Sequence, residues 1–313
     1  MAQPSRRRLR RSIRLSHIEL LAAMQEKRTM SEAAKDVHLT QPAASRLLRS
    51  LSDDLNIKLF ERSGRTLRPT TAGEALLRYS REIVAELDRA HLELEAINQG
   101  MIGRVSVGAG IASCYVLIPE TIAALMRSTQ KIAVTVREGS MDDLLAKLRD
   151  GSLDIVVGRI DNTGRDRDLV VEDLYDPMMH VIAGPNHKLG GRREVRWDDV
   201  LQYSWILPEL GTPMRTAIEN VFRRKRYRPA SCIMESSSIQ TNIGLLNRSN
   251  LLWVLSSDVA VYFQKLGLTR ILPVPAMPGP SPFIVAHARN RALSPAATNF
   301  LELLHSTAKS GRH

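Results

Sequence analysis

The chain has 313 residues, 43% of them hydrophobic, which is enough for two or three buried cores and predicts a multidomain protein. We expect no membrane-spanning helix, because no long apolar run occurs, and no signal peptide, because Arg14, His17 and Glu19 break up the apolar segment that would have to follow the basic N-terminus. The two cysteines, Cys114 and Cys232, exclude a disulfide scaffold and fit a cytoplasmic protein. Aromatic residues make up only 4%, which argues against a stacking surface for single-stranded nucleic acid.

Positive charge is concentrated near the N-terminus. Residues 1–75 hold 15 Lys/Arg against 8 Asp/Glu, whereas the other 238 residues hold 29 against 25. The segment Ser5–Arg11 forms a basic arm with five arginines. Such an uneven distribution is expected where a domain neutralises DNA phosphates.

Residues 30–61 have the pattern of two short helices joined by a tight turn. Thr40 is a plausible N-cap of the second helix, and Pro42 suits its first turn, where no backbone N–H is needed. We expect Leu47, Leu48 and Leu51 to face inward. The side chains left outward would then be small or hydrogen-bonding, as entry into a major groove requires: Gln41, Ala43, Ala44, Ser45, Arg46 and Arg49.

A short basic hairpin is expected over Leu59–Thr70, centred on Ser63-Gly64. It would form a wing whose arginines lie along the phosphates. Two amphipathic helices by themselves fit plain core scaffolding about as well. The wing, the basic arm and the charge distribution together favour a helix-turn-helix that binds duplex DNA.

The motifs of this region resemble those of the LysR-type transcriptional regulators of bacteria over about sixty residues. They are Ser31-Glu32-Ala33-Ala34, Leu39–Arg46, Leu51, Leu55, Leu59-Phe60-Glu61-Arg62 and Thr71-Ala72-Gly73. The resemblance implies groove-facing roles for Thr40, Gln41, Pro42, Ser45 and Arg46 and wing contacts by Arg62 and Arg65, while the helix pattern adds Arg49. The chain departs from the family pattern at Ala44, Ser52 and Asn56, where Leu, Glu and Gly are usual. Asn56 tolerates the left-handed conformation at a helix end, whereas Ala44 could alter either packing or base preference.

A helix of about seven turns is predicted from Thr71 to Gln99, with apolar residues three or four positions apart. One interpretation is a helix packed on its own domain. The other is a seam between subunits, and the LysR resemblance implies this one: a linker helix that pairs subunits in a homodimer or homotetramer. The stripe runs through Leu76, Tyr79, Ile83, Leu87, Ala90, Leu94 and Ile97, with Leu76, Ile83, Leu87 and Leu94 as the main dimerisation candidates.

After Gly103 strands alternate with helices of about ten residues, which predicts βαβ units and a parallel sheet. The LysR resemblance implies two lobes like those of the type 2 periplasmic-binding-protein fold. The predicted fold class is therefore a multidomain α+β protein with a winged helix-turn-helix, a linker helix and a two-lobed α/β effector domain. The expected bounds are 1–73, 74–100 and 101–313, with lobe I about 101–173 and 276–313 and lobe II about 174–275.

A small-molecule effector is expected beyond the carboxyl ends of the strands, where loops lead into helices. The loops after four predicted strands each offer a hydroxyl, and the third strand is followed by a possible counter-charge. Taken singly, each serine is as well explained as a helix N-cap. The candidates, as a group, are Ser113, Ser140, Arg159, Thr212 and Ser237.

The predicted function is sequence-specific regulation of transcription, modulated by an effector between two lobes and exerted on RNA polymerase. We expect no enzyme activity, no cofactor and no metal, because neither a nucleophile elbow nor metal-ligand spacing occurs. A solute-binding protein or an enzyme on the same fold is the alternative, and a nucleoid-type DNA binder without effector is another.

Two further features carry weaker hypotheses. Cys114 adjoins a predicted helix start, where a thiolate would be stabilised, although an unreactive structural role is favoured over redox sensing. The cluster Arg223–Arg228 follows a helix and precedes Pro229. One interpretation is a solvated helix end, and the alternative is a contact with the DNA backbone or with another subunit.

Overall fold

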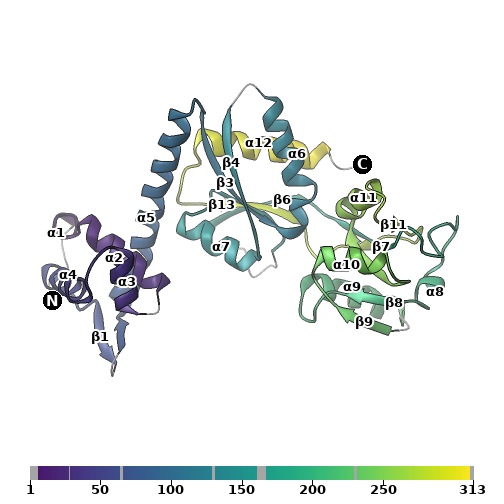
Figure 1. Ribbon diagram of the computed structural model, residues 1–313, viewed down its shortest axis with the longest axis horizontal. Helices are drawn as coiled ribbons and strands as arrows, with labels where there is room; N and C mark the ends of the chain where they lie inside the picture. The colour runs from purple at the N-terminus through teal and green to yellow at the C-terminus, as the bar shows by residue number, and fades with distance from the viewer. Residues whose placement is uncertain are drawn as a thin grey trace. The chain divides into compact units, whose positions relative to one another are not determined.

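The computed structural model describes residues 6–27, 29–63, 66–128, 131–160, 167–228 and 231–310 (Figure 1). Two compact units make up the chain. The first is Met1–Gln99 with the short segment Arg149–Ser152, and the second is Gly100–Leu148 with Leu153–His313. None of the helices within the described ranges is long and apolar enough to cross a membrane.

The first unit is a helical core followed by a hairpin. Alanine and leucine side chains of three helices fill the core, among them Ala33, Leu48 and Leu51, together with Leu59 and Leu77. The antiparallel hairpin pairs Phe60 with Pro69. The elements are α1 (Arg6–Ser12), α2 (Leu15–Glu26), α3 (Met30–Asp36), α4 (Gln41–Leu55), β1 (Phe60–Ser63) and β2 (Thr66–Pro69).

The long helix α5 (Thr71–Asn98) confirms the helix predicted from its periodicity. Two hydrogen bonds hold the start of α5. Gly73 N–H donates to the Thr70 hydroxyl at 3.2 Å, and Thr70 N–H donates to the Leu59 carbonyl at 2.9 Å. A Cβ on Gly73 would lie 2.1 Å from that same carbonyl oxygen, so only glycine permits the approach. This contact explains the Thr71-Ala72-Gly73 motif physically.

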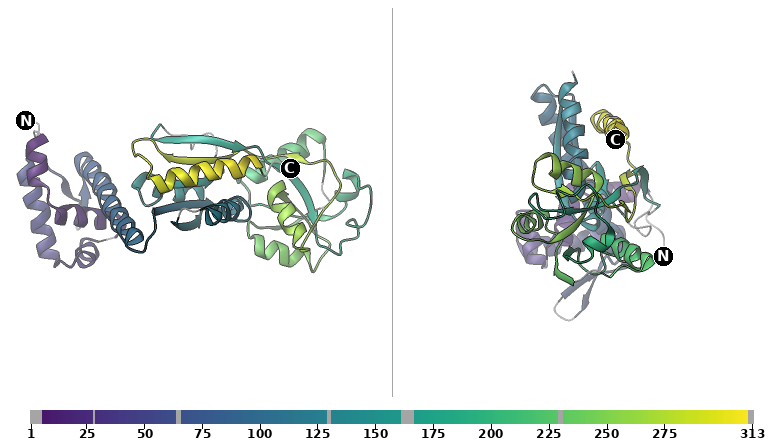
Figure 2. Two further views of the ribbon diagram at one scale, coloured as in Figure 1. Left: turned by 90° about the horizontal axis from the view of Figure 1, so that it is seen from above. Right: turned by 90° about the vertical axis from the view of Figure 1, so that its right-hand side faces the viewer.

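Lobe I of the second unit is a five-stranded sheet of order β4-β3-β5-β13-β6, with helices on both faces (Figure 1). One face packs against α6 and α12 through residues such as Val107, Phe283 and Phe300, and Figure 2 shows α12 lying along the sheet. The other face packs against α7 through Leu144 and Leu148. The elements are β3 (Gly103–Gly110), the 3-10 turn η1 (Ile111–Cys114), α6 (Leu117–Arg127), β4 (Ile132–Gly139), α7 (Met141–Asp150), β5 (Ile155–Gly158), β6 (Leu169–Tyr175), β13 (Phe283–Ala288) and α12 (Pro295–Ser310).

Lobe II is a six-stranded sheet of order β11-β7-β10-β8-β9, with β12 also paired to β7. Trp205 and Phe222 fill the core under α9, whereas Ile206 and Phe263 fill the core under α10 and α11. The elements are β7 (Met178–Ala183), α8 (Trp197–Val200), β8 (Ser204–Leu207), α9 (Pro213–Lys225), β9 (Ser231–Glu235), α10 (Ile239–Leu246), β10 (Leu252–Ser256), α11 (Ser257–Lys265), β11 (Arg270–Ile271) and β12 (Met277–Pro278).

Both sheets are mixed, which corrects the expectation of a parallel sheet. Strands β3, β4 and β5 are parallel, but β13 runs antiparallel to both β5 and β6. In lobe II, β7 likewise runs antiparallel to β10. The chain crosses from lobe I to lobe II after Tyr175 and returns before Phe283. The first strand after each crossing, β7 in lobe II and β13 in lobe I, enters its sheet from the other lobe and so runs antiparallel to its neighbours β10 and β5.

Candidate DNA-binding and effector sites

The N-terminus of α4 is built as the sequence predicts. Thr40 has extended backbone angles, and its hydroxyl accepts a hydrogen bond from Ala43 N–H at 3.4 Å. Pro42 occupies the first turn, where its missing N–H has no cost. At the other end Asn56 adopts the left-handed conformation with φ 54°, which confirms its expected role in ending the helix.

The exposed surface of α4 is mostly polar. Gln41, Pro42, Arg46 and Arg49 are exposed, and within the described part of the chain neither guanidinium has a hydrogen-bond or ion-pair partner. Ser45 is half-buried at the edge of this face. The two arginines are therefore free to meet base edges or phosphates.

Ala44 faces the core, not the solvent, which corrects the expected outward position. It is fully buried among the side chains that join α4 to the neighbouring helices. The departure from the Leu usual in the LysR pattern thus concerns packing. The buried residues of α4 are Ala44, Leu48, Leu51 and Leu55, while Leu47 is half-buried.

The hairpin predicted as a wing is present as β1 and β2. Ser63 pairs with Thr66 and Arg62 pairs with Leu67, so the strands are joined by the two residues 64 and 65. Gly64 and Arg65 lie outside the described residues, so the role of Arg65 stays a prediction. Arg62 belongs to β1, and Arg68 of β2 is exposed.

The basic arm is a helix over most of its length. Arg10 and Arg11 of α1 are exposed, and α1 packs against α4, the helix with the candidate DNA-binding face. Ile13, just after α1, packs against the core of the unit. The arm contains few apolar residues among its arginines, so no helical period could be recognised and this helix was not predicted. Ser5 lies outside the described residues.

The apolar stripe of α5 is exposed in the isolated chain. Leu94 is 62% exposed, and Leu87 and Ile83 are 48% and 44% exposed. Leu76, by contrast, packs partly against the core of the first unit. Large apolar side chains thus remain exposed along one face of α5 among the described residues, and their role in dimerisation stays a prediction.

Three of the five candidate effector residues lie at one edge of the lobe I sheet. Strands β4, β3 and β5 are adjacent and parallel, so their carboxyl ends meet. A Cβ on Gly110 would lie 3.4 Å from both Gly158 Cα and Met141 Sδ, which shows how closely these ends approach. Ser140 is exposed there, and its hydroxyl accepts from Asp143 N–H at 3.3 Å, so it also caps α7.

Ser113 differs from the others because it is fully buried. Its hydroxyl donates to the Gly110 carbonyl at 2.7 Å, with the Val157 carbonyl at 3.3 Å. The hydroxyl proton therefore stabilises the turn between β3 and α6. This geometry favours a structural role for Ser113.

Arg159 lies at the junction of the lobes. Its guanidinium is 4.2 Å from the centre of the Phe283 ring, and its Nε and Nη2 are buried without a hydrogen-bond partner among the described residues. Burial lowers the pKa of Arg159, and the charge of Asp258 on α11 opposes that shift. Beside it, Tyr175 Oη donates to Asp258 Oδ2 at 3.0 Å and so links the lobes. No local pattern in the sequence indicates this link, because Tyr175 and Asp258 are far apart along the chain.

Thr212 and Ser237 follow the adjacent parallel strands β8 and β9 of lobe II. The Thr212 hydroxyl accepts from Arg215 N–H at 3.3 Å and donates to the Glu209 carbonyl at 2.8 Å, so it caps α9. Ser237 is exposed, and the cap of α10 is its neighbour Ser238, which accepts from Thr241 N–H at 3.3 Å. The predicted residues thus form one group in each lobe.

Cys114 lacks the environment of a reactive thiol. Burial, followed by the negative charge of Glu138 and a hydrogen bond with it, raises the pKa of Cys114 to about 11. The expected stabilisation of a thiolate beside the helix start is therefore wrong. No group of three metal-binding side chains occurs among residues that the structure describes.

Fold and site together define a class: a winged-helix DNA-binding unit joined to a two-lobed α/β ligand-binding domain. The family model described as the bacterial regulatory helix-turn-helix protein of the lysR family matches residues 15–74, and the LysR substrate binding domain matches residues 98–309. The chain belongs to the LysR family of transcriptional regulators. It is a DNA-binding regulator with an effector-binding domain, and the alternative of a solute-binding protein or enzyme is not favoured.

Individual relatives agree with this assignment. The chain is 27% identical to the HTH-type transcriptional regulator GbpR of Azospirillum brasilense, over 96% of this chain and 88% of the relative. It is 30% identical to the HTH-type transcriptional regulator GalR of Pseudomonas putida, over 90% and 70%. In fold it is similar to CbnR, a LysR family transcriptional regulator, with a TM-score of 0.62 at 18% identity, covering 95% of this chain and 99% of that one.

Proposed function

We propose that this LysR-family regulator reads its operator with α4, pairs through α5, and responds to an effector held between its lobes. The observation that carries the proposal is the exposed face of α4, where Arg46 and Arg49 have no partner in the described chain. Gln41 and Pro42 share that face, and Thr40 and Ser45 border it. Arg62 and Arg65 of the wing would contact phosphates.

The exposed side chains on this face are short or polar, which supports the proposal that α4 reads bases. A major groove about 12 Å wide admits a helix only where its outer side chains are short or extended polar ones. Arginine pairs with guanine through two hydrogen bonds, which a rigid helix can place accurately. A structural relative of the same family, CbnR, has been solved with its target DNA, and the present chain matches that structure with a TM-score of 0.61.

The test is Arg46→Ala measured on cognate and on random duplex DNA at fixed salt. We expect a loss of about 1–3 kcal/mol of binding free energy on the cognate site and much less on random DNA. Arg62→Ala is the contrasting variant: it should weaken binding to all sequences alike and flatten the salt dependence. Equal losses on both DNAs for Arg46→Ala would make it a phosphate contact and refute the base-reading role.

For the effector we propose Ser140, Arg159, Thr212 and Ser237 as the contacting group, whereas the buried hydroxyl of Ser113 would shape the turn behind them. Binding would bias the relative position of the lobes only if the effector prefers one arrangement. A changed spacing of DNA-binding pairs in a homotetramer would then alter DNA bending and access for RNA polymerase. The protein would act in the cytoplasm without a cofactor and without catalysing a reaction.

Footprinting across a panel of carboxylates and sugars tests the effector proposal. A ligand-dependent change in the protected region, lost in Thr212→Ala or Ser237→Ala, would support it. If no ligand changes the footprint, the protein would be an architectural DNA binder that works without an effector.

A further inference from the structure

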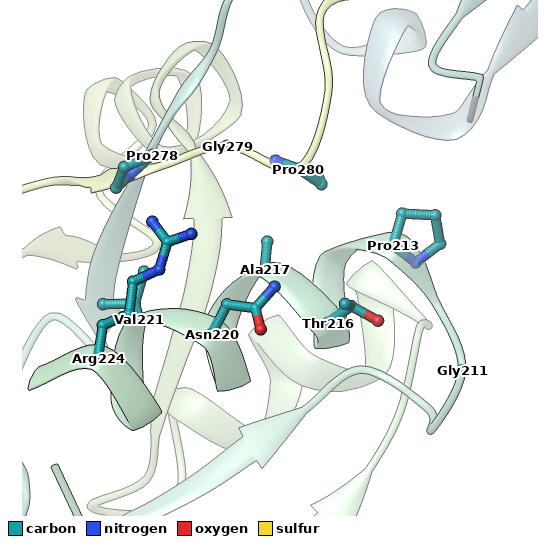
Figure 3. Close-up of a pocket in the computed structure, with 10 residues that line it drawn as sticks. All are labelled: Gly211, Pro213, Thr216, Ala217, Asn220, Val221, Arg224, Pro278, Gly279 and Pro280. Atoms are coloured by element: carbon teal, nitrogen blue, oxygen red, sulfur yellow. The ribbon is translucent and has the colours of Figure 1, made fainter. Parts of the chain in front are cut away.

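A pocket of about 360 Å³ lies in lobe II between α9 and residues 278–280, the segment that leads back to lobe I (Figure 3). This volume falls within the range of small-molecule sites, and the pocket opens to solvent on one side. None of the five candidate effector residues lines it. Gly211 and Pro213, on either side of Thr212, do line it, so the pocket begins next to one of those residues and extends along α9.

One wall of the pocket is polar. Thr216, Asn220 and Arg224 are four residues apart on α9 and so share one face of the helix. In Figure 3 the Arg224 guanidinium reaches across toward Pro278 and Gly279, and the Asn220 amide lies further along α9, on the side of Thr216. Thr216 Oγ1 donates to the Thr212 carbonyl at 3.2 Å, which leaves its lone pairs available.

The positive charge in this wall is unpaired. Within the described chain Arg224 has no ion pair and no hydrogen bond, and the same holds for the Asn220 side chain. The acidic neighbour on α9, Glu219, is already bound by Arg215, whose Nε lies 2.7 Å from Glu219 Oε1. A guanidinium at a pocket wall without a carboxylate partner is suited to an anionic ligand.

The remaining walls are apolar and stiff. Ala217 and Val221 of α9 face the proline rings of Pro278 and Pro280. Gly279, between the two prolines, is held by a hydrogen bond from its N–H to the Pro177 carbonyl at 3.0 Å. A Cβ at this position would lie 2.2 Å from that oxygen, so only glycine permits the contact. Such a wall holds its shape without a ligand, which lowers the ordering cost of binding.

We infer that this pocket binds a small carboxylate with an apolar ring, as a second ligand site distinct from the proposed effector residues. The carboxylate pairs with the Arg224 guanidinium and reaches the Asn220 amide. The ring packs against Pro278, Pro280 and Val221, where it is removed from water. Arg223 and Lys225, the other basic residues at this end of α9, do not line the pocket, so the Arg223–Arg228 cluster contributes one specific contact.

The experiment titrates sodium benzoate into the full-length protein by calorimetry, with benzamide as the uncharged analogue and inorganic phosphate as the anion without a ring. Saturable benzoate binding is expected, and benzamide and phosphate should each bind at least about tenfold more weakly, since one charge-assisted pair or the ring contact is then lost. Equal binding of benzamide would refute carboxylate recognition. Equal binding of phosphate would refute the ring contact.

Variants locate the site. Arg224→Gln should weaken benzoate binding about tenfold or more, whereas the matched control Arg223→Gln, an exposed neighbour with the same charge change, should stay within about twofold. DNA binding without benzoate should be unchanged in both. Equal losses in the two variants, no saturation up to about 10 mM, or loss only in Arg159→Gln would overturn the inference. Because DNA affinity is measured separately, failure here leaves the proposed regulatory function standing.

Discussion

The arginines of this chain take three different roles, which depend on their surroundings and not on sequence position. Arg46 is exposed and has no partner in the described chain. Arg215 is held by Glu219, Glu235 and a backbone carbonyl, so its charge is used within lobe II. Arg159 is half-buried, with its guanidinium against an aromatic ring at the lobe junction. Only the first kind contributes fully to the attraction between protein and DNA.

Cys114 gives a prediction at the same scale, because only the thiolate reacts with alkylating reagents. In a Cys232→Ser background, iodoacetamide labelling of Cys114 should be slow near neutral pH and should rise with pH until it levels off around its pKa of about 11. Glu138→Gln removes a negative charge that raises the pKa, so it should speed labelling at pH values below 11. Labelling already at its maximum near neutral pH would contradict the raised pKa.

At the scale of elements, side-chain hydrogen bonds fix the ends of the helices. The segment 247–250, which follows α10, contains no glycine, and polar side chains form the turn instead. Asn247 Nδ2 donates to the Ile243 carbonyl at 2.8 Å and to the Leu268 carbonyl at 3.1 Å. Ser249 Oγ donates to the Leu245 carbonyl at 2.7 Å. These bonds add to the backbone hydrogen bonds that Asn247 N–H and Arg248 N–H already make at the end of α10, and the bond to Leu268 ties the turn to the residues after α11.

Asn56 supplies the corresponding prediction for α4. With φ 54°, a residue carrying a Cβ but no local hydrogen-bonding group is strained, so Asn56→Ala should lower the local stability of α4 by about 1–2 kcal/mol. Asn56→Gly should leave it nearly unchanged, because glycine adopts this conformation freely. Hydrogen exchange of the α4 amides in the full chain measures both. Equal protection in the Ala and Gly variants would show that the left-handed turn does not limit this helix end.

At the scale of the whole molecule, each lobe has its own two-sided core, and the α5 stripe has none. Phe300 and Leu144 cover opposite faces of the lobe I sheet, while Phe222 and Phe263 do so in lobe II. Leu87 and Leu94 of α5 have no comparable cover from the residues that the structure describes. The near-heptad spacing of the stripe is typical of paired helices, so a second copy of α5 is the proposed cover.

Leu87→Glu tests this pairing. A carboxylate in an apolar seam loses its hydration without gaining a partner, so sedimentation should show a shift toward smaller species at equal protein concentration. Thr71→Glu is the matched control, since it adds the same single carboxylate at an exposed position of α5 outside the stripe. If both variants keep the assembly of the unmodified protein, the stripe is not the seam.

Local chemistry explains what the sequence determined by itself. The N-cap at Thr40, the left-handed Asn56, the full length of α5 and most strands and helices after Gly103 follow from neighbouring residues and a repeating period. LysR membership rests on such local motifs as well. A short-range pattern survives in the sequence because the residues that produce it are close together along the chain.

Contacts between distant residues decided the rest. The sequence placed Ala44 outward, yet packing buries it, and Ser113 is likewise enclosed by a neighbouring strand. The mixed sheets depend on where the chain crosses between lobes, and the pocket depends on α9 meeting Pro278–Pro280 some sixty positions later. No period or spacing encodes such meetings, because they arise only when separate elements pack into a common core.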